Sequence, residues 1–305
     1  LGQTSNWPEK AVRWVVPFAP GGTSSIVARS IGAELTKQLG VPFVIDNKGG
    51  GGGVPAMQEA LRAPADGYTI VMSHIGLMAV NPLIYPDSGY DVNKDFSPIS
   101  KLGSGPLLLV VNPQTGITQV AGLIDNAKRN PNSLNYVSAG QGSINHLSGE
   151  LFAQRTGTQM THIPYKGSGP AMTDVLAKQV DMTFVSTVGS IQAIKEKRVI
   201  PMAISSSIRV PTLPEVPTFT ELGFKEMEQI YGWYGIWYPT GTPADRVEKV
   251  QNIVQQFLKH PDIKTHFDEI GLIPVGSSSS EFAQFITEDI MHQNKLFKIA
   301  KVAAQ

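Results

Sequence analysis

The feature that most constrains the fold is a unit that recurs along the chain: an apolar strand, a turn of small residues and an amphipathic helix. In the first unit, residues 12–16 form a predicted buried strand that ends at Pro17, and a helix pattern follows Gly21 and Gly22 and ends at Gly40. Apolar residues within this pattern recur with helical spacing: Val27, Ile31 and Leu35. Repeated units of this kind predict an α/β fold, in which helices cover a parallel sheet.

The same alternation continues along the chain and restarts after residue 107. Strands are predicted at residues 12–16, 43–45, 68–72, 107–111, 134–137, 160–163, 182–185, 200–204 and 231–238. Helices are predicted at residues 23–39, 55–61, 145–154, 170–179, around 191–194, at 243–257 and at 282–297. A length of 305 residues suits two domains of about 150 residues each.

We interpret residues 107–111 and 231–238 as two strands that cross between two lobes. The first lobe is then residues 1–106 plus 231–305, because the C-terminal helices return to it, and the second lobe is residues 107–230. Two lobes joined by two crossover strands leave a cleft between them. This geometry is common in proteins that close around a ligand by a hinge motion.

Composition excludes several classes of partner and chemistry. The chain has 25 basic and 25 acidic residues, so its formal net charge is zero and we expect no nucleic-acid partner and no polybasic contact with a membrane. The absence of cysteine excludes disulfides, thiolate metal sites and a cysteine nucleophile. No stretch of the sequence approaches the roughly 18 apolar residues that a membrane span needs.

Motifs for metals and cofactors are also missing. The six histidines do not show the H-E-x-x-H spacing of zinc hydrolases. The five glycines at residues 49–53 follow a strand but do not fit the G-x-G-x-x-G pattern of dinucleotide sites. We therefore expect no metal ion and no cofactor.

Three small-residue loops follow predicted strands and are the strongest candidates for a binding site. They lie at residues 17–25, 138–146 and 164–170, and each leads into a helix. Ligands of open α/β sheets bind beyond the carboxyl ends of strands, and the free amides and dipole of a helix N-terminus favour an anion without any Lys or Arg. The loops therefore suit a carboxylate, although each one alone also fits an ordinary capped helix after a tight turn.

A possible serine–histidine pair and an aromatic strand each have a structural interpretation that is simpler than a functional one. Ser143 and His146 lie three residues apart at a helix start, but no G-x-S-x-G motif surrounds any serine, and this spacing favours a capping or packing histidine over an activated pair. The aromatic residues of 231–238 lack interleaved Lys or Arg, so core or hinge packing is expected there and not a stacking platform for bases.

Five sequence blocks together resemble the Bug family, the periplasmic solute-binding components of tripartite tricarboxylate transporters. The blocks are VVPFAPGG at residues 15–22, DGYT at 66–69, YVSAG at 136–140, HIPYKG at 162–167 and LPEVPT at 213–218. The resemblance implies a type II periplasmic-binding-protein fold that closes like a Venus flytrap, a monomer that is not an enzyme, and membrane permease subunits as partners. It also implies a periplasmic location and a signal peptide, whose pattern the first ten residues lack.

The resemblance further implies that backbone amides and ordered waters of two strand–helix loops hold a ligand carboxylate. Carried over to this sequence, the residues are Phe18, Ala19, Gly22, Thr23 and Ser24 in the first lobe, and Ala139, Gly142 and Ser143 in the second. The rest of the pocket is expected to be lined by Ser73, His74, Pro164 and Tyr165.

Two departures from the family pattern bear on the ligand. Many members have an Asp where this chain has Ser25, and many have Asp-Asn where this chain has Val185 and Ser186. Without these acids the site is less suited to an ammonium group. The sequence therefore favours a plain organic acid, di- or tricarboxylic or aromatic, over an amino acid.

Two alternatives remain open at this point. One is an enzyme of the same two-lobed fold that acts on a carboxylate ester or amide through Ser143 and His146. The other is a binding protein whose partner is a sensor kinase and not a permease.

Overall fold

The first strand–turn–helix unit forms as its sequence predicts in the computed structural model, which describes residues 6–302. Strand β1 (Val12–Val16) ends at Pro17, and helix α1 (Thr23–Leu39) begins after Gly22. The helix ends at Gly40, which adopts the left-handed conformation (φ +72°) and donates its amide to the carbonyl of Thr36.

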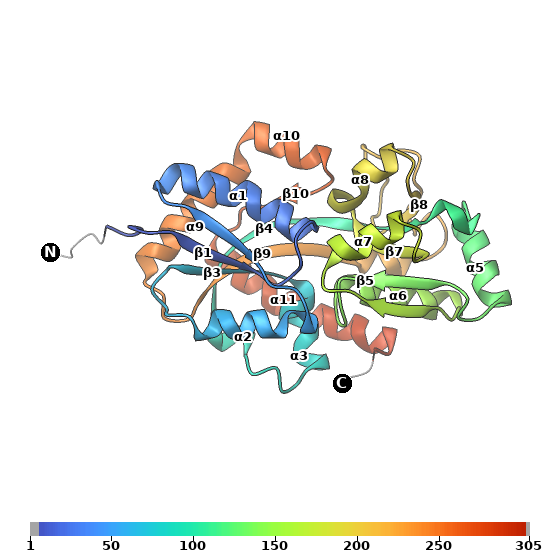
Figure 1. Cartoon of the computed structure of the whole chain (residues 1–305), viewed down its shortest axis with the longest axis horizontal. Helices are drawn as coiled ribbons and strands as arrows, with labels where there is room; N and C mark the ends of the chain where they lie inside the picture. Colours follow the sequence, from blue (N-terminus) through green and yellow to red (C-terminus); the bar gives the residue numbers. More distant parts are fainter. Residues whose placement is uncertain (1–5, 303–305) are drawn as a thin grey trace.

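The first sheet, on the left of Figure 1, combines parallel and antiparallel strands. Strands β2 (Phe43–Asn47) and β3 (Thr69–His74) flank β1 in parallel. Antiparallel strands extend the sheet: β9 (Tyr231–Pro239), the first part of β4 (Phe96–Val111), and β10 (Ile273–Pro274). The accompanying helices are α1, η1 (Gly51–Gly53), α2 (Val54–Arg62), η2 (Gly76–Val80), α3 (Asn81–Ile84), α4 (Val92–Asp95), α9 (Ala244–Lys259), α10 (Pro261–Glu269) and α11 (Ser279–Ala300).

The second sheet, on the right of Figure 1, contains the remaining strands and the end of β4. Its strands are β5 (Asn135–Ser138), β6 (Thr161–Pro164), β7 (Met182–Ser186) and β8 (Ile200–Ile204). Its helices are η3 (Pro113–Thr115), α5 (Val120–Arg129), α6 (Ile144–Thr156), α7 (Ser168–Leu176), α8 (Thr187–Lys195) and η4 (Lys225–Gln229). Strands β6, β5 and β7 run parallel, so α6, α7 and α8 each begin beyond the carboxyl end of a strand.

The chain crosses between the two sheets in two places. Residues 96–106 of β4 pair with β9, and residues 107–111 of the same strand pair with β7 and β8. The predicted crossing strand at 107–111 is thus the end of a longer strand. Strand β9 lies wholly in the first sheet, and the chain enters that sheet from the second one just before Tyr231. Ser205 ties both crossings together, because its hydroxyl accepts from the amide of Leu107 (2.9 Å) and donates to the carbonyl of Ile230 (2.6 Å).

The C-terminal helix α11 fixes the crossing from one side. It contacts β4 of the first lobe and α6 of the second. Its Asp289, only 3% exposed, accepts hydrogen bonds from the hydroxyl of Tyr231 (2.7 Å) and the indole of Trp233 (2.8 Å). Both donors belong to the first residues of β9, so a buried carboxylate anchors the helix where the lobes join.

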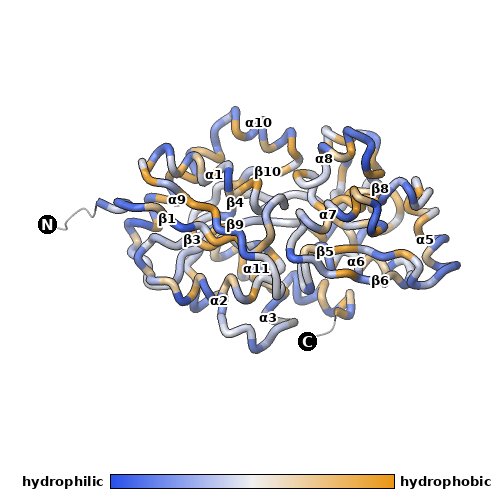
Figure 2. The backbone as a smooth tube through the Cα atoms, viewed as in Figure 1, coloured by the Kyte–Doolittle hydropathy of each residue, from blue (hydrophilic) through white to orange (hydrophobic). Residues whose placement is uncertain are grey.

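Aromatic side chains fill the core of the first lobe. Trp14, Trp233, Trp237 and Phe282 are all fully buried, and the rings of Trp233 and Phe282 meet edge to face at 5.7 Å. In the hydropathy view, orange apolar stretches alternate with blue ones along the chain, and hydrophilic residues gather on outer turns such as those of α10 (Figure 2). Among residues 6–302, no helix combines the length and the apolar composition that crossing a bilayer requires.

Replacing Asp289 with Ala is expected to lower the free energy of unfolding by about 3 kcal/mol, because two aromatic donors lose their acceptor. Urea denaturation measures this. Glu288→Ala, an exposed neighbour on the same helix, serves as the control and should change stability by less than about 0.5 kcal/mol. Equal stability of the two variants would contradict the anchoring role of Asp289.

Candidate functional site

A cavity lies where the two lobes meet, with about 420 Å³ of empty space that includes a part open to solvent. The first lobe contributes Phe18, Thr23, Ser24, His74 and Ile75, the second lobe Ala139, Ile144, Asn145, Ser168 and Ser186, and the crossing segments Leu107, Gly232, Trp233 and Tyr234. A smaller cavity of about 180 Å³ shares Phe18, His74 and Ala139 and extends toward Gly52, Asn81 and Ser143.

Helix N-termini surround the larger cavity. The first two residues of α1 (Thr23 and Ser24) and of α6 (Ile144 and Asn145) line it, as does Ser186, the N-cap of α8. The first amides of a helix have no intrahelical acceptor, and the helix dipole places partial positive charge there. The cavity is therefore suited to a negatively charged group.

None of the described residues that line the larger cavity is Lys, Arg, Asp or Glu. Its polar groups are hydroxyls, the amide of Asn145 and the imidazole of His74. Burial lowers the pKa of His74 to about 4 and raises that of Tyr234 to about 12, so both side chains are neutral at physiological pH. Attraction for an anion therefore comes from dipoles and hydrogen-bond donors.

The two lobes are in contact across the cleft. The amide of Ala19 donates to the carbonyl of Lys166 at 2.9 Å, and the hydroxyls of Thr23 and Ser186 lie 2.6 Å apart. On another side of the cleft, the hydroxyl of Thr187 donates to the carbonyl of Gly271 at 2.6 Å. The two lobes thus touch each other at several points around the cavity.

Two glycines permit this close approach. A Cβ on Gly22 would lie 2.5 Å from the hydroxyl oxygen of Ser168, and a Cβ on Gly169 would lie 2.5 Å from the carbonyl oxygen of Pro20. No side chain fits between the loops at these points. The small residues of the loops therefore allow closure as well as access to a ligand.

The first-lobe loop is held from beneath by Asn47. Its side-chain amide donates to the carbonyl of Phe18 (2.9 Å) and to the hydroxyl of Ser25 (2.8 Å). Ser25 is fully buried and does not line the cavity. Of the two departures noted in the sequence, only Ser186 faces the space for a ligand.

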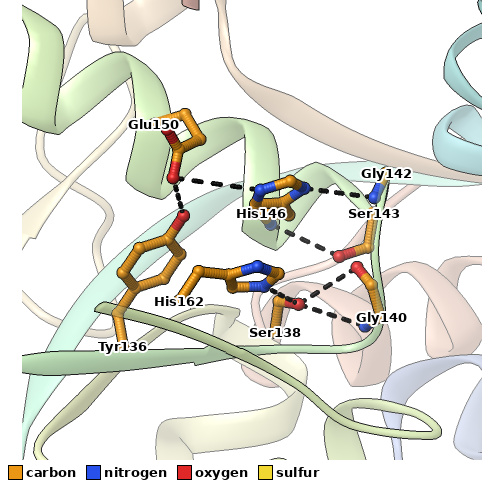
Figure 3. A network of polar contacts seen from close by, with 8 residues as sticks. All are labelled: Tyr136, Ser138, Gly140, Gly142, Ser143, His146, Glu150 and His162. Carbon is orange, nitrogen blue, oxygen red and sulfur yellow. Dashed lines mark hydrogen bonds and ion pairs between the residues drawn. The ribbon is translucent and has the colours of Figure 1, made fainter. Parts of the chain in front are cut away.

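The second-lobe loop is held by a network of polar and stacked side chains (Figure 3). The hydroxyl of Ser138 contacts the ring of His162 (2.7 Å) and bonds both the amide and the carbonyl of Gly140. The rings of His162 and His146 stack at 3.9 Å, and Tyr136 stacks on the other face of His162 at 5.0 Å. The hydroxyl of Tyr136 donates to Glu150.

Both stacked histidines are neutral. Burial lowers the pKa of His146 to about 4, and burial together with the neighbouring His146 lowers that of His162 to about 3. The Nδ1 atom of His146 accepts the amide of Gly142 (3.2 Å), so the ring proton lies on Nε2. Two neutral rings can stack at this distance without charge repulsion.

Ser143 and His146 do not form a nucleophile–base pair in this structure. The hydroxyl of Ser143 accepts the backbone amide of His146 at 3.3 Å, which is the N-cap contact of α6 (Figure 3). The imidazole of His146 faces Gly142 and Glu150 instead.

Some of the predicted site residues line the cavities, and others are engaged within the protein or lie away from both cavities. The larger cavity is lined by Phe18, Thr23, Ser24, His74 and Ala139, and the smaller one by Ser143. The amides of Ala19 and Gly142 are engaged within the protein, and Gly22 meets Ser168. Ser73 is buried away from both cavities, and its hydroxyl finds no partner among the described residues. Neither cavity includes Pro164, which is exposed, or Tyr165, whose hydroxyl donates to Asp174.

Four polar residues of the cavity were not among the named site residues: Asn145 and Ser168, which lie in two of the predicted loops, Ser186, which was noted only as a departure from the family pattern, and Tyr234. Ser186 carries the same signal as the three chosen loops, since it follows a strand and precedes a helix. Tyr234 gave no such signal, because its neighbours in β9 are core residues and its exposure to the cleft depends on the second lobe.

Comparison with known proteins agrees with this geometry. The family model described as "Tripartite tricarboxylate transporter family receptor" matches residues 27–302. Protein BugT of Bordetella pertussis is 32% identical over 93% of this chain and 87% of its own length. A structure from R. palustris with adipate is 35% identical, with a TM-score of 0.94, over 98% of this chain and 100% of that one. MatC of Rhodopseudomonas palustris with bound malate is 31% identical, with a TM-score of 0.89, over 96% and 100%.

The fold and the cleft define a two-lobed solute-binding protein. The chain belongs to the tripartite tricarboxylate transporter family of receptors, since the family model covers most of its length. The resemblance to the Bug family and the type II fold that it implied are thus confirmed.

The buried histidines predict a pH dependence of stability. Their folded pKa values lie below the unfolded value of about 6.5, so the unfolded chain binds more protons between about pH 4 and 6.5, and the free energy of unfolding falls as the pH falls through this window. His162→Gln keeps a donor for Ser138 but cannot titrate. It should reduce the slope near pH 5 by about 1 kcal/mol per pH unit.

Chemical denaturation at several pH values measures this slope. His266→Gln, at an exposed position, is the control and should leave the slope unchanged. A His162→Gln slope equal to that of the wild type would show that His162 is protonated in the folded protein as readily as in the unfolded chain.

Proposed function

We propose that the protein captures a small organic acid in the periplasm and presents it to the membrane subunits of a tripartite transporter. The observation that carries this proposal is the cavity between the lobes, where helix N-termini and hydroxyls of both lobes converge and none of the described lining residues is charged. Such a site offers a carboxylate several donors. It offers no anionic partner to an ammonium group.

A dicarboxylate is the ligand class that the site and the relatives support best. Two solved relatives above 30% identity hold adipate and malate, respectively. The larger cavity of this chain is lined by polar residues from opposite lobes, Ser24 in the first and Asn145 in the second, and by the apolar Phe18 and Ile144. An acid with a short apolar middle and polar ends matches this distribution.

The location and the partner follow from the family. Related structures are described as a periplasmic transporter and a periplasmic binding protein. We infer the same compartment for this chain, a monomeric state, and permease subunits as the partner that receives the ligand. A pull-down from membrane fractions distinguishes the permease from a sensor kinase.

We also propose that residues 1–106 plus 231–305 move as one body and residues 107–230 as the other. The two sheets change partners at residue 107 of β4, and Tyr231 lies opposite Pro106. Rotation about this junction would separate Ala19 from Lys166 and Thr23 from Ser186 and open the cavity.

A thermal-shift panel tests the ligand class. At about 100 times the Kd, a bound dicarboxylate should stabilise the protein by about 2.7 kcal/mol. Adipate, malate and succinate are compared with aspartate and glutamate, and the acid is recovered afterwards to check that it is unchanged. Stabilisation by the amino acids alone, or turnover of an ester or amide that Ser143→Ala abolishes, would contradict the proposal.

Closure is tested by Gly169→Ala. The backbone of Gly169 suits any residue, but the new methyl group would meet the carbonyl of Pro20 only when the lobes close. We expect the affinity for the dicarboxylate to fall about tenfold, since such overlap costs about 1–3 kcal/mol, while the free energy of unfolding changes little. Isothermal titration calorimetry and urea denaturation measure the two quantities.

Gly122→Ala is the matched control for this variant. Gly122 lies in α5, where the nearest atom to a new Cβ is 3.9 Å away. Its affinity should equal that of the wild type. Equal affinity of Gly169→Ala and the wild type would show that ligand binding does not need the contact between Gly169 and Pro20.

A further inference from the structure

The peptide between Gln141 and Gly142 lies where the second-lobe loop meets the first lobe. A Cβ on Gly52, in η1, would lie 3.5 Å from the carbonyl oxygen of Gln141 in this peptide, and a Cβ on Gly76, the first residue of η2, would lie 3.1 Å from the carbonyl oxygen of Gly142 in the next peptide. The amide of Gly76 donates to the Nδ1 atom of His74 at 2.8 Å, so the start of η2 also orients an imidazole that lines both cavities. The orientation of the Gln141–Gly142 peptide therefore affects how the two lobes fit together beside the ligand site.

His146 sets that orientation. Its Nδ1 atom accepts the amide of Gly142, which is buried in the loop and adopts a left-handed conformation (φ +77°). The hydrogen bond needs a neutral ring with its proton on Nε2, since a protonated Nδ1 would face another donor. The carboxylate of Glu150 lies 3.9 Å from Nε2, on the side where that proton is expected.

The ring of His146 is held by a second imidazole that stacks on it. His162 stacks on it at 3.9 Å with an angle of 9° between the planes, and His162 is held by Ser138 below the same loop (Figure 3). His146 is 4% exposed. The stacked ring of His162, the amide of Gly142 and the carboxylate of Glu150 together fix the orientation of the His146 ring.

We propose that His146 is a positioning residue for ligand binding, which holds the Gln141–Gly142 peptide in the orientation that lets the second-lobe loop meet the first lobe around the ligand. The proposal rests on the proposed function, because the ligand site is the one between the lobes. It assigns a role to a histidine that the sequence marked only as a possible partner of Ser143. Ser143 contributes its hydroxyl to the cap of α6, and His146 contributes its ring to the loop before it.

Two substitutions of His146 distinguish the role of its hydrogen-bond acceptor, Nδ1, from the role of the volume of its side chain. His146→Asn places a side-chain oxygen near the position of Nδ1 and can accept the amide of Gly142. His146→Leu has a similar volume but no acceptor, so the buried amide loses its partner. Affinity for adipate is measured by titration calorimetry, and stability by urea denaturation, for both variants and for His266→Leu at an exposed position.

We expect His146→Leu to bind adipate at least about tenfold more weakly than the wild type, and His146→Asn to bind within about threefold of it. His266→Leu should bind as the wild type does. Similar losses in both His146 variants, or none in either, would overturn the proposal. A wild-type protein that binds no dicarboxylate would instead contradict the proposed function.

A spectroscopic measurement on the unmodified protein covers the case in which His146→Leu does not fold. An N–H···N hydrogen bond transmits a scalar coupling between its two nitrogens, which NMR detects in isotopically labelled protein. We expect this coupling between the Gly142 amide and His146 Nδ1 in the adipate-bound protein. Its absence, with Nδ1 protonated, would overturn the proposal.

Discussion

The contact between Ala19 and Lys166 joins backbone to backbone across the cleft, and the architecture of the site depends on that closeness. Loops can approach within hydrogen-bond distance along their main chains only where no side chain intervenes, as at Gly22 and Gly169. The same absence of side chains leaves helix amides and short hydroxyls as the groups that face a ligand. The small residues of these loops therefore allow the two lobes to meet and also leave amides and hydroxyls free to contact a ligand.

An anion site without cations also explains the polar supports behind the loops. Dipoles attract a carboxylate only if they are held in the correct direction, because a free loop would reorient toward solvent. Asn47 holds the first-lobe loop, and the stacked His162 and His146 hold the second. His146 is buried, His162 is half-buried and both are neutral, so they add no charge that would compete with the hydrogen bonds they orient.

The local signals of the sequence were sufficient for the strand–turn–helix units and for the loops at residues 17–25 and 138–146, because each unit is determined by adjacent residues. The first half of β4 was not predicted, since residues 96–106 are rich in serine, glycine and proline and become a strand only by pairing with β9 and β10. The cavity position of Tyr234 depends in the same way on distant parts of the chain.

If helix ends and hydroxyls of both lobes hold a carboxylate without a cationic side chain, a crystal structure of the protein with adipate should reveal this arrangement. We expect one carboxylate within hydrogen-bond distance of the first amides of α1 and α6, with no Lys or Arg nitrogen within about 4 Å of it. A carboxylate paired with Lys or Arg, or bound outside the cleft, would contradict this expectation.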